Sequence, residues 1–300
     1  MIIPEHLQTG DTIAIAAPAR KISKNEIAAA EMLLQESGFK VYYDDRLFAE
    51  CHQFAGNEDF RAGYIQDLLD NPEIKAIWCA RGGYGSVRII DRLDFSAFCK
   101  RPKWIVGYSD VTVFHSHINK NYEIATLHAT MPINVKMENL HSTATQSLIA
   151  ALKGEPLQYP IPAHPFNRPG NVTAPVIGGN LSMLYSLLGS PSDIDTTGKV
   201  LFIEDLDEYL YHIDRMMENI VRNGKFEHLA GLLVGHLSDM HDNTIPFGKT
   251  AEEIVAEHCR PYDFPIVFNF PAGHLADNRA LRMGCPIQIN FGNSNITIEN

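Results

Sequence analysis

The sequence lacks the features of a membrane-bound or exported protein. No uninterrupted apolar stretch in its 300 residues is long enough to cross a lipid bilayer. The first residues, Met1 to His6, also lack the basic segment and apolar core of a secretory signal. We therefore expect a cytoplasmic protein that has no membrane partner.

Positive charge is also scarce. The chain has 25 lysines and arginines against 36 aspartates and glutamates, which gives a formal net charge of -11 at pH 7. Such a chain repels a phosphate backbone, and no stripe of basic residues with interleaved aromatics offsets the repulsion. Nucleic acid is therefore not an expected partner, whereas a small cationic or zwitterionic substrate is compatible with the charge.

Cysteine is rare, and its spacing does not indicate pairing. The five cysteines are odd in number, lie far apart and contain no C-x-x-C pair. This usage favours reduced, mostly buried thiols over a disulfide framework.

A recognisable metal-binding motif is missing as well. The predicted loop after residue 235 contains His236, Asp239 and His241, but it has no helical H-E-x-x-H arrangement. His115 and His117 are two positions apart on a predicted helix, so they lie on different sides of it. We expect no metal and no other cofactor. A metal-dependent amidase that uses His236, Asp239 and His241 remains an alternative.

The first half of the chain alternates between strand and helix patterns. Short apolar runs are followed by segments in which apolar residues recur with helical spacing. The predicted strands are 11–18, 41–43, 76–79, 104–107 and 124–127, and the predicted helices are 25–36, 59–70, 87–93 and a segment that opens at 109. This order predicts an α/β fold with a parallel sheet covered by helices on both faces. Ligands of such sheets bind at the carboxyl ends of the strands.

A proline-rich segment divides the chain. Residues 156–175 are rich in proline and have no helical period, which is typical of a linker between domains 1–155 and 176–300. The second domain is predicted to contain strands at 199–204, 232–235, 265–270, 286–290 and 296–299, and helices at 181–188, 209–223 and 250–258.

A glycine-rich loop, Arg81-Gly-Gly-Tyr-Gly85, follows directly after the third predicted strand. Its three glycines permit a tight turn and bring main-chain N–H groups close to a ligand. The loop lacks the Lys-Ser/Thr of a P-loop and the full G-x-G-x-x-G spacing, so nucleotide binding is not favoured. Donation of the Gly83 N–H to an oxyanion fits better, and a turn that binds no ligand is the alternative.

Ser109 lies where the next apolar run turns into a helical segment. A serine at such a turn can point its hydroxyl into a cleft, where free N–H groups at the helix start face a carbonyl oxygen. The stretch alone favours a simpler role as a helix cap, because the G-x-S-x-G pattern is not met. His128, at the end of the following strand, is expected to be a hydrogen-bonded structural residue rather than a cleft residue.

Two more candidate side chains lie at strand ends in the second half. Glu204 ends an apolar run, and a buried carboxylate there needs a partner such as an imidazole. Asp205, Asp207 and Glu208 have a simpler explanation, because acids are favoured at the N-terminus of the next helix. His274 follows a glycine at the mouth of another strand and is well placed to reach a cleft. We rank Glu204 above Glu208 for chemistry, but the choice between them stays open.

Ser109, Glu204 and His274 together suggest acyl transfer. His274 would accept the serine proton, and Glu204 would orient and stabilise the imidazolium. The main-chain N–H groups of Gly83 and Asp110 would hold the oxyanion.

The motifs that contain these residues resemble those of the LD-carboxypeptidase family of serine peptidases in order and separation. The resemblance covers nearly the whole chain. The motifs are Arg81-Gly-Gly-Tyr-Gly85, Gly107-Tyr-Ser-Asp110, Gly178-Gly-Asn180-Leu181, Ile203-Glu-Asp205, and Gly273-His274 with Asn278.

The resemblance implies a structure and an activity. It implies a flavodoxin-like N-terminal domain, a smaller β-rich C-terminal domain, and Ser109, Glu204 and His274 as the triad. It further implies a cytoplasmic homodimer that removes the terminal D-alanine from murein tetrapeptides, after an L-configured centre, in cell-wall recycling. One departure from the family is Leu281-Arg282 in place of Leu-Pro, which we expect to alter a wall of the pocket.

The substrate contacts and two further functions remain open. The candidate substrate-binding residues are Arg81, Tyr84, Asn180 and Arg279, of which the two arginines are candidates for the terminal carboxylate. The family is also similar to a self-immunity branch that cleaves peptide-nucleotide antibiotics, although those members tend to be longer. A non-enzymatic module that binds a muropeptide in the same cleft is the other alternative.

Overall fold

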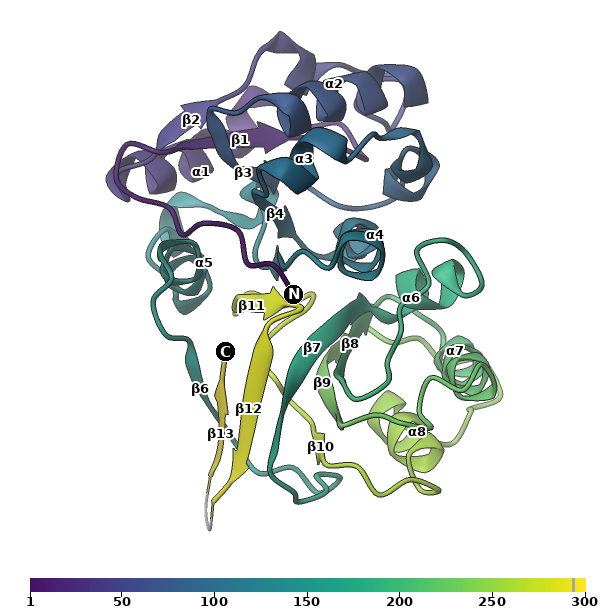
Figure 1. The fold of residues 1–300 in the computed structure, drawn as a ribbon. Coiled ribbons are helices and arrows are strands. Elements are labelled where there is room, and N and C mark those ends of the chain that lie inside the picture. The colour runs from purple at the N-terminus through teal and green to yellow at the C-terminus, as the bar shows by residue number, and fades with distance from the viewer. Residues whose placement is uncertain (293–294) are drawn as a thin grey trace.

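Two β-sheets, each with its own helices, make up the protein in the computed structural model, which describes residues 1–292 and 295–300 (Figure 1). The first sheet has the strand order β11-β5-β4-β3-β1-β2, and the second has the order β10-β9-β8-β7-β12-β13-β6. In Figure 1 the first sheet and its helices occupy the upper half of the view, and the second sheet lies below them.

The first sheet is parallel except at one edge, where β11 runs antiparallel to β5. Its strands are β1 (Thr12–Ala16), β2 (Lys40–Tyr42), β3 (Ile74–Cys79), β4 (Trp104–Gly107), β5 (Thr126–His128) and β11 (Leu281–Met283). The helices of this half are α1 (Lys24–Glu36), α2 (Glu58–Asp70), α3 (Ser96–Lys100), α4 (Thr112–Tyr122) and α5 (Thr143–Lys153).

Helices cover both faces of this sheet, as the strand-helix alternation predicts. Helices α1 and α5 pack with Trp78 and Trp104 on one face, whereas α2, α3 and α4 pack with Ile77 and Ile105 on the other. Neighbouring strand residues point to opposite faces, so a nearly continuous apolar strand can supply both layers. The predicted α/β fold with a flavodoxin-like first half is confirmed.

The second sheet is mixed. Strands β7 to β10 are parallel to one another, and β12, β13 and β6 extend the sheet with antiparallel pairs. Its strands are β6 (Gln158–Ile161), β7 (Val172–Asn180), β8 (Val200–Leu206), β9 (Gly231–Ser238), β10 (Ile266–Val267), β12 (Pro286–Phe291) and β13 (Ile296–Glu299). The helices are α6 (Leu181–Leu187), α7 (Leu210–Arg222) and α8 (Ala251–His258). The smaller β-rich second half is therefore also confirmed.

Strands β7 and β11 and helices α3 and α5 were not predicted from the sequence, and two further segments also differ from the prediction. Residues 87–93 form two short 3-10 turns, Ser86–Arg88 and Ile90–Arg92, in place of one helix. Their bonds run from each N–H to the carbonyl three residues earlier, so no full α-helical turn forms. Strand β6 lies inside the predicted linker, at the edge of the second sheet, where a proline is tolerated. The division into domains at 156–175 stays a prediction.

The two sheets share one hydrophobic cluster. Trp104 and Leu127 of the first sheet belong to the same cluster of buried side chains as Phe202 and Ile287 of the second. Strand β11 comes from the end of the chain but pairs with β5, with Leu281 opposite His128. The C-terminal part of the chain is thus anchored to both sheets.

Among the helices of the described residues, none combines the length and the apolar character that spanning a membrane would require.

Arg282, the residue noted as a departure from the family pattern, is a buried structural residue of β11. Its guanidinium donates to the carbonyl oxygens of Glu155 at 2.7 Å, Asn300 at 2.8 Å and Ala151 at 3.2 Å. It does not line the cavity described below, so the expectation that it alters a wall of the pocket is wrong. Arg282 instead joins β11 to the end of α5 and to the C-terminus.

Replacing Arg282 with methionine should therefore affect stability rather than turnover. Arg282→Met keeps most of the side-chain volume but removes three hydrogen bonds, although the Ala151 and Asn300 oxygens each keep a main-chain donor. We expect the free energy of unfolding, measured by urea denaturation, to fall by about 3 kcal/mol. The exposed Arg260 provides the control, because Arg260→Met should change the free energy of unfolding by less than about 0.5 kcal/mol. Equal stability of the two variants would contradict the role of Arg282.

Candidate active site

A cavity of about 510 Å³ lies where the carboxyl ends of strands from both sheets meet. The first sheet contributes residues that follow β1, β3, β4 and β5, and the second contributes residues at the ends of β7 and β8. Thr112 at the start of α4 accepts a hydrogen bond from the Asn180 N–H at 3.0 Å, which joins the two edges. The residues most relevant to chemistry are Arg20, Arg81, Gly82, Gly83, Ser109, Asp110, Asn180, Asp205, Glu208 and His274.

Ser109 sits at a strained turn on this cavity. Its φ angle is 61°, a left-handed conformation that costs a residue other than glycine about 1–3 kcal/mol. The residue opens a 3-10 turn, Ser109–Val111, that connects β4 to α4, and its side chain caps neither the turn nor the helix. This geometry favours a nucleophile over a helix cap, because the turn holds the hydroxyl at the cavity.

Gly82 approaches Ser109 most closely in the glycine-rich loop. A Cβ atom on Gly82 would lie 2.9 Å from the Ser109 Cβ and 3.1 Å from its Oγ, so only glycine fits without displacement. Gly83, and not Gly82, is the position that the sequence predicts to be functional. The signal for both was the same Gly-Gly pair, and only the fold distinguishes the two positions.

The Asp110 carboxylate holds this loop in place. It is buried and accepts hydrogen bonds from the Ser86 N–H at 2.9 Å and the Gly85 N–H at 3.3 Å. Buried Arg61 donates to the Gly85 carbonyl at 2.9 Å, which fixes the same peptide from the other side. Burial raises the pKa of Asp110, although the two N–H groups oppose the shift. The sequence predicts a role for the main-chain N–H of Asp110 but gives no signal for this role of its side chain.

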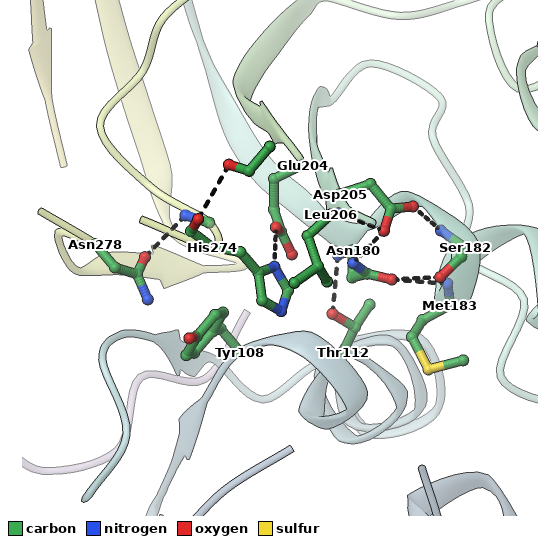
Figure 2. A network of polar contacts seen from close by, with 12 residues as sticks. Tyr108, Thr112, Asn180, Ser182, Met183, Glu204, Asp205, Leu206, His274 and Asn278 are labelled. Atoms are coloured by element: carbon green, nitrogen blue, oxygen red, sulfur yellow. Dashed lines mark hydrogen bonds and ion pairs between the residues drawn. The ribbon is translucent and has the colours of Figure 1, made fainter. Parts of the chain in front are cut away.

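Glu204 and His274 form a direct pair. The Nδ1 atom of His274 is 2.7 Å from Oε2 of Glu204, whose side chain is fully buried (Figure 2). A Cβ atom on Gly273 would lie 2.8 Å from that oxygen, so the glycine before the histidine makes room for the carboxylate. Gly235 of β9 serves the same purpose, because its Cβ would lie 3.1 Å from the Cβ of Glu204.

The pair changes the proton affinity of His274. Burial alone would lower the pKa of this imidazole, but the hydrogen bond and negative charge of Glu204 outweigh burial and raise the pKa above its ordinary value. The ring of Tyr108, the residue before Ser109, packs against the imidazole with ring centres 4.8 Å apart. His274 therefore faces the cavity next to the serine turn.

Glu208 has a different partner. Its Oε2 is 2.5 Å from Nδ1 of His212, one helical turn further along the chain. Glu208 lines the cavity, but His274 is paired with Glu204. The geometry agrees with the ranking of Glu204 above Glu208, while the catalytic role of either acid stays a prediction.

The loop that carries His274 is tied to the first sheet. Asn278, drawn in Figure 2, accepts a hydrogen bond from the Gly273 N–H at 2.9 Å. Its Oδ1 is also 3.1 Å from Nε2 of His128. Burial lowers the pKa of His128 to about 3, so its ring is neutral and its Nε2–H donates to Asn278. His128 is thus a hydrogen-bonded structural residue, the role that the sequence favoured.

Asp205 organises the wall formed by the second sheet. It accepts hydrogen bonds from Nδ2 of Asn180 at 2.9 Å and from the Ser182 N–H at 2.8 Å (Figure 2). Burial and the neighbouring charge of Glu204 raise the pKa of Asp205 to about 7. The explanation of Asp205 as a helix N-terminal acid is therefore wrong, since it is a buried strand residue and α7 begins at Leu210.

The predicted substrate-binding residues fall into two groups. Arg81 and Asn180 line the cavity. Tyr84 and Arg279 are not among the residues that line the cavity. Tyr84 is exposed beside Phe54, and Arg279 is paired with Asp277. Arg20 also lines the cavity, although it was not predicted, because no sequence motif marks it.

The residues proposed for a metal-dependent amidase do not form a ligand set. Within residues 1–292 and 295–300, no group of three or more histidine, cysteine, aspartate or glutamate side chains is arranged to hold a metal ion. His241 instead lies 2.5 Å from an oxygen of Asp207.

Known proteins resemble this chain over its whole length. Residues 13–129 match the family model for the LD-carboxypeptidase N-terminal domain, and residues 173–289 match that for the C-terminal domain. A probable murein peptide carboxypeptidase of Bacillus subtilis (strain 168) is 32% identical over 303 residues, which cover 99% of this chain and 94% of that protein. The crystal structure of muramoyltetrapeptide carboxypeptidase from Oxalobacter formigenes matches with a TM-score of 0.87 and 26% identity, covering 96% of this chain and 98% of that one. The microcin C7 self-immunity protein MccF of Escherichia coli is 26% identical over 329 residues, covering 97% of this chain and 94% of its own.

A serine at a strand-to-helix turn, beside a histidine-carboxylate pair, is typical of serine hydrolases. The matches to both domain models and to full-length relatives identify one family within this class. The chain belongs to the LD-carboxypeptidase family, a family of serine peptidases, and the predicted resemblance is confirmed.

The choice between the two glutamates can be tested by separate substitutions. Glu204→Gln removes the charge that orients and stabilises the His274 imidazolium, so we expect kcat to fall on the order of 10⁴-fold. Glu208→Gln should have a small effect, because Glu208 is paired with His212. The measurement is steady-state carboxypeptidase turnover, with circular dichroism as a check of folding. Loss of turnover only in Glu208→Gln would reverse the assignment.

The raised pKa of His274 predicts a pH dependence. A protonated imidazole cannot accept the serine proton, so kcat/KM should decline as the pH falls through the pKa of His274. Because that pKa is raised from the ordinary value of 6.5, the midpoint of the acid limb should lie above pH 6.5. In Glu204→Gln, where burial is opposed only by the more weakly acting Asp205, the midpoint should move to lower pH. A midpoint that does not respond to this substitution would show that another group titrates.

Proposed function

We propose that this protein is a serine carboxypeptidase that removes the terminal D-alanine from murein tetrapeptides by cleaving the L,D-peptide bond. The single observation that carries the proposal is the 2.7 Å pair between Glu204 and His274 at a cavity that Ser109 also lines. The substrate is supported by two relatives, whose names are probable murein peptide carboxypeptidase and muramoyltetrapeptide carboxypeptidase.

The first half of the proposed reaction forms an acyl-enzyme. The Ser109 hydroxyl attacks the carbonyl carbon of the scissile bond while Nε2 of His274 accepts its proton. Glu204, bound to Nδ1, stabilises the imidazolium that results. The tetrahedral intermediate then collapses, and His274 passes the proton to the nitrogen of the departing D-alanine.

Water completes the reaction. With D-alanine gone, His274 accepts a proton from a water molecule, which attacks the acyl carbon and forms a second tetrahedral intermediate. Its collapse breaks the ester bond, and His274 returns the proton to the Ser109 oxygen. The products are D-alanine and the shortened peptide.

The oxyanion of both intermediates is assigned to main-chain N–H groups at the serine turn. In this proposal they come from Asp110 and from Gly83 in the glycine-rich loop, whose position the Asp110 carboxylate fixes through Gly85 and Ser86. One such donor typically contributes a factor on the order of 10²–10³ to kcat.

The setting of the activity is part of the same proposal. All five cysteines are free thiols, which suits a reducing compartment and thus a cytoplasmic role in cell-wall recycling. The homodimer implied by the family resemblance is likewise proposed here.

A second candidate function is cleavage of a peptide-nucleotide antibiotic. It is favoured by one observation, the similarity to the self-immunity protein MccF over nearly the full length of both chains. We prefer the muropeptide substrate because the first relative described above, at 32% identity, is named as a murein peptide carboxypeptidase.

The proposed function is tested by incubating the protein with matched L,D- and L,L-peptides and measuring released D-alanine. We expect release from the L,D-tetrapeptide, and we expect Ser109→Ala to fold normally but lose turnover by roughly a thousandfold or more.

Three outcomes would contradict the proposal. Activity that survives Ser109→Ala but is lost with a chelator would indicate a metal-dependent amidase. Binding of the peptide with no D-alanine release would indicate a binding module. Cleavage of a peptide-nucleotide substrate alone would favour the immunity function.

A further inference from the structure

Two arginines form one side of the cavity, and the one without a motif, Arg20, has no role in the reaction described so far. Arg20 follows β1, whereas Arg81 follows β3, the neighbouring strand of the first sheet. The placement of Arg20 and its lack of an internal partner indicate a role in binding substrate.

The backbone around Arg20 is rigidly held. Arg20 forms an isolated β-bridge with Phe54, and the Lys21 N–H donates to the Gln53 carbonyl at 3.0 Å. On the other side, buried Arg61 donates to the Pro18 carbonyl at 2.5 Å. The backbone that carries the Arg20 side chain is therefore fixed before a ligand arrives, which lowers the main-chain entropy lost on binding.

The side chain of Arg20 extends over the glycine-rich loop. A Cβ atom on Gly83 would lie 2.1 Å from Cδ of Arg20 and 2.7 Å from its Cγ, so the aliphatic stem occupies that space. The neighbouring Gly82 is the residue that packs against Ser109. The guanidinium of Arg20 is therefore attached beside the loop assigned to the oxyanion.

The two arginines differ in their internal contacts. Arg81 donates to the Lys21 carbonyl at 3.2 Å and lies 3.8 Å from a carboxylate oxygen of Glu26. Arg20 is exposed, and its guanidinium makes no side-chain hydrogen bond or ion pair with any of the described residues. The donors of Arg20 remain available for a ligand.

Negative charge is concentrated on another part of the cavity wall. Asp205, Asp207 and Glu208 all follow or end β8, in the second sheet. On the side of the arginines, the lining acid Asp110 is buried and bound by the Gly85 and Ser86 N–H groups. A ligand carboxylate would therefore be repelled by the second-sheet wall and attracted to the arginines.

A carboxypeptidase has to recognise the carboxylate of the departing residue, and a cation at about this position can do so. The carboxylate carbon of the departing residue lies only about 3–4 Å from the scissile carbonyl carbon, because they are one residue apart. A guanidinium beside the oxyanion loop can reach that carboxylate and bind both oxygens in a planar, bidentate arrangement.

We propose that Arg20 binds the α-carboxylate of the departing terminal residue and thereby restricts the enzyme to the end of a peptide. Arg81 adds positive charge to the same wall. The peptide then extends from Ser109 toward the wall formed by β7 and β8. This inference rests on the proposed function, because it requires that a terminal residue is released.

The test compares a tetrapeptide that has a free C-terminal carboxylate with the same peptide as its C-terminal amide. In the wild-type protein we expect the free acid to be preferred. Arg20→Gln should reduce kcat/KM for the free acid by roughly 10- to 100-fold, mainly through KM, while leaving the amide nearly unchanged. The preference for the acid should therefore disappear, and Arg20→Lys should restore part of it.

Arg92 provides the matched control, since it is a surface arginine paired with Asp59 and is not among the cavity-lining residues. Arg92→Gln should keep both rates and the preference. An unchanged preference in Arg20→Gln, an equal loss for acid and amide, or loss of the preference only in Arg279→Gln would each overturn the proposal. Failure of the wild-type protein to release D-alanine from the free acid would instead overturn the proposed function, so the two failures are distinguishable.

Discussion

The return of the chain from the second sheet to the first is the constraint on which the site depends. After β10 the chain passes through the loop 271–280 and then adds β11 to the edge of the first sheet, beside β5. The hydrogen bonds from His128 and the Gly273 N–H to Asn278 fix that loop along its path. His274 is thereby held against Tyr108, next to the serine turn, although 165 positions separate Ser109 from His274 in the sequence.

Buried carboxylates surround the cavity, and each is matched by donors from a different part of the chain. Asp110 is bound by N–H groups of the glycine-rich loop, Asp205 by Asn180 and Ser182, and Glu204 by His274. A buried charge without such partners is costly, so these contacts determine how the loops are arranged. The cavity is also asymmetric, because both lining arginines lie on the side of the first sheet with Asp110, whereas Asp205, Asp207 and Glu208 lie on the side of the second.

Much of the fold was predictable because its signals are local. Apolar periodicity located most strands and helices of the first sheet, and glycines, prolines and helix caps marked their ends. Strand β6 and strand β11 were missed because both are short and are defined by partners far away, β13 and β5. Their hydrogen bonds exist only once the rest of the sheet has formed, so no local pattern identifies them.

The sequence by itself determined the fold class, the turn at Ser109 and the candidate residues at the strand ends, because these depend on residue spacing and on motifs within a few positions. It also supported Glu204 over Glu208 without deciding between them. Only the tertiary structure decided which carboxylate meets His274, that Gly82 packs on the serine, and that Arg20 belongs to the cavity. The physical reason is that these contacts join segments brought together by long-range strand pairing and by the burial of charge, neither of which appears in any short window of the chain.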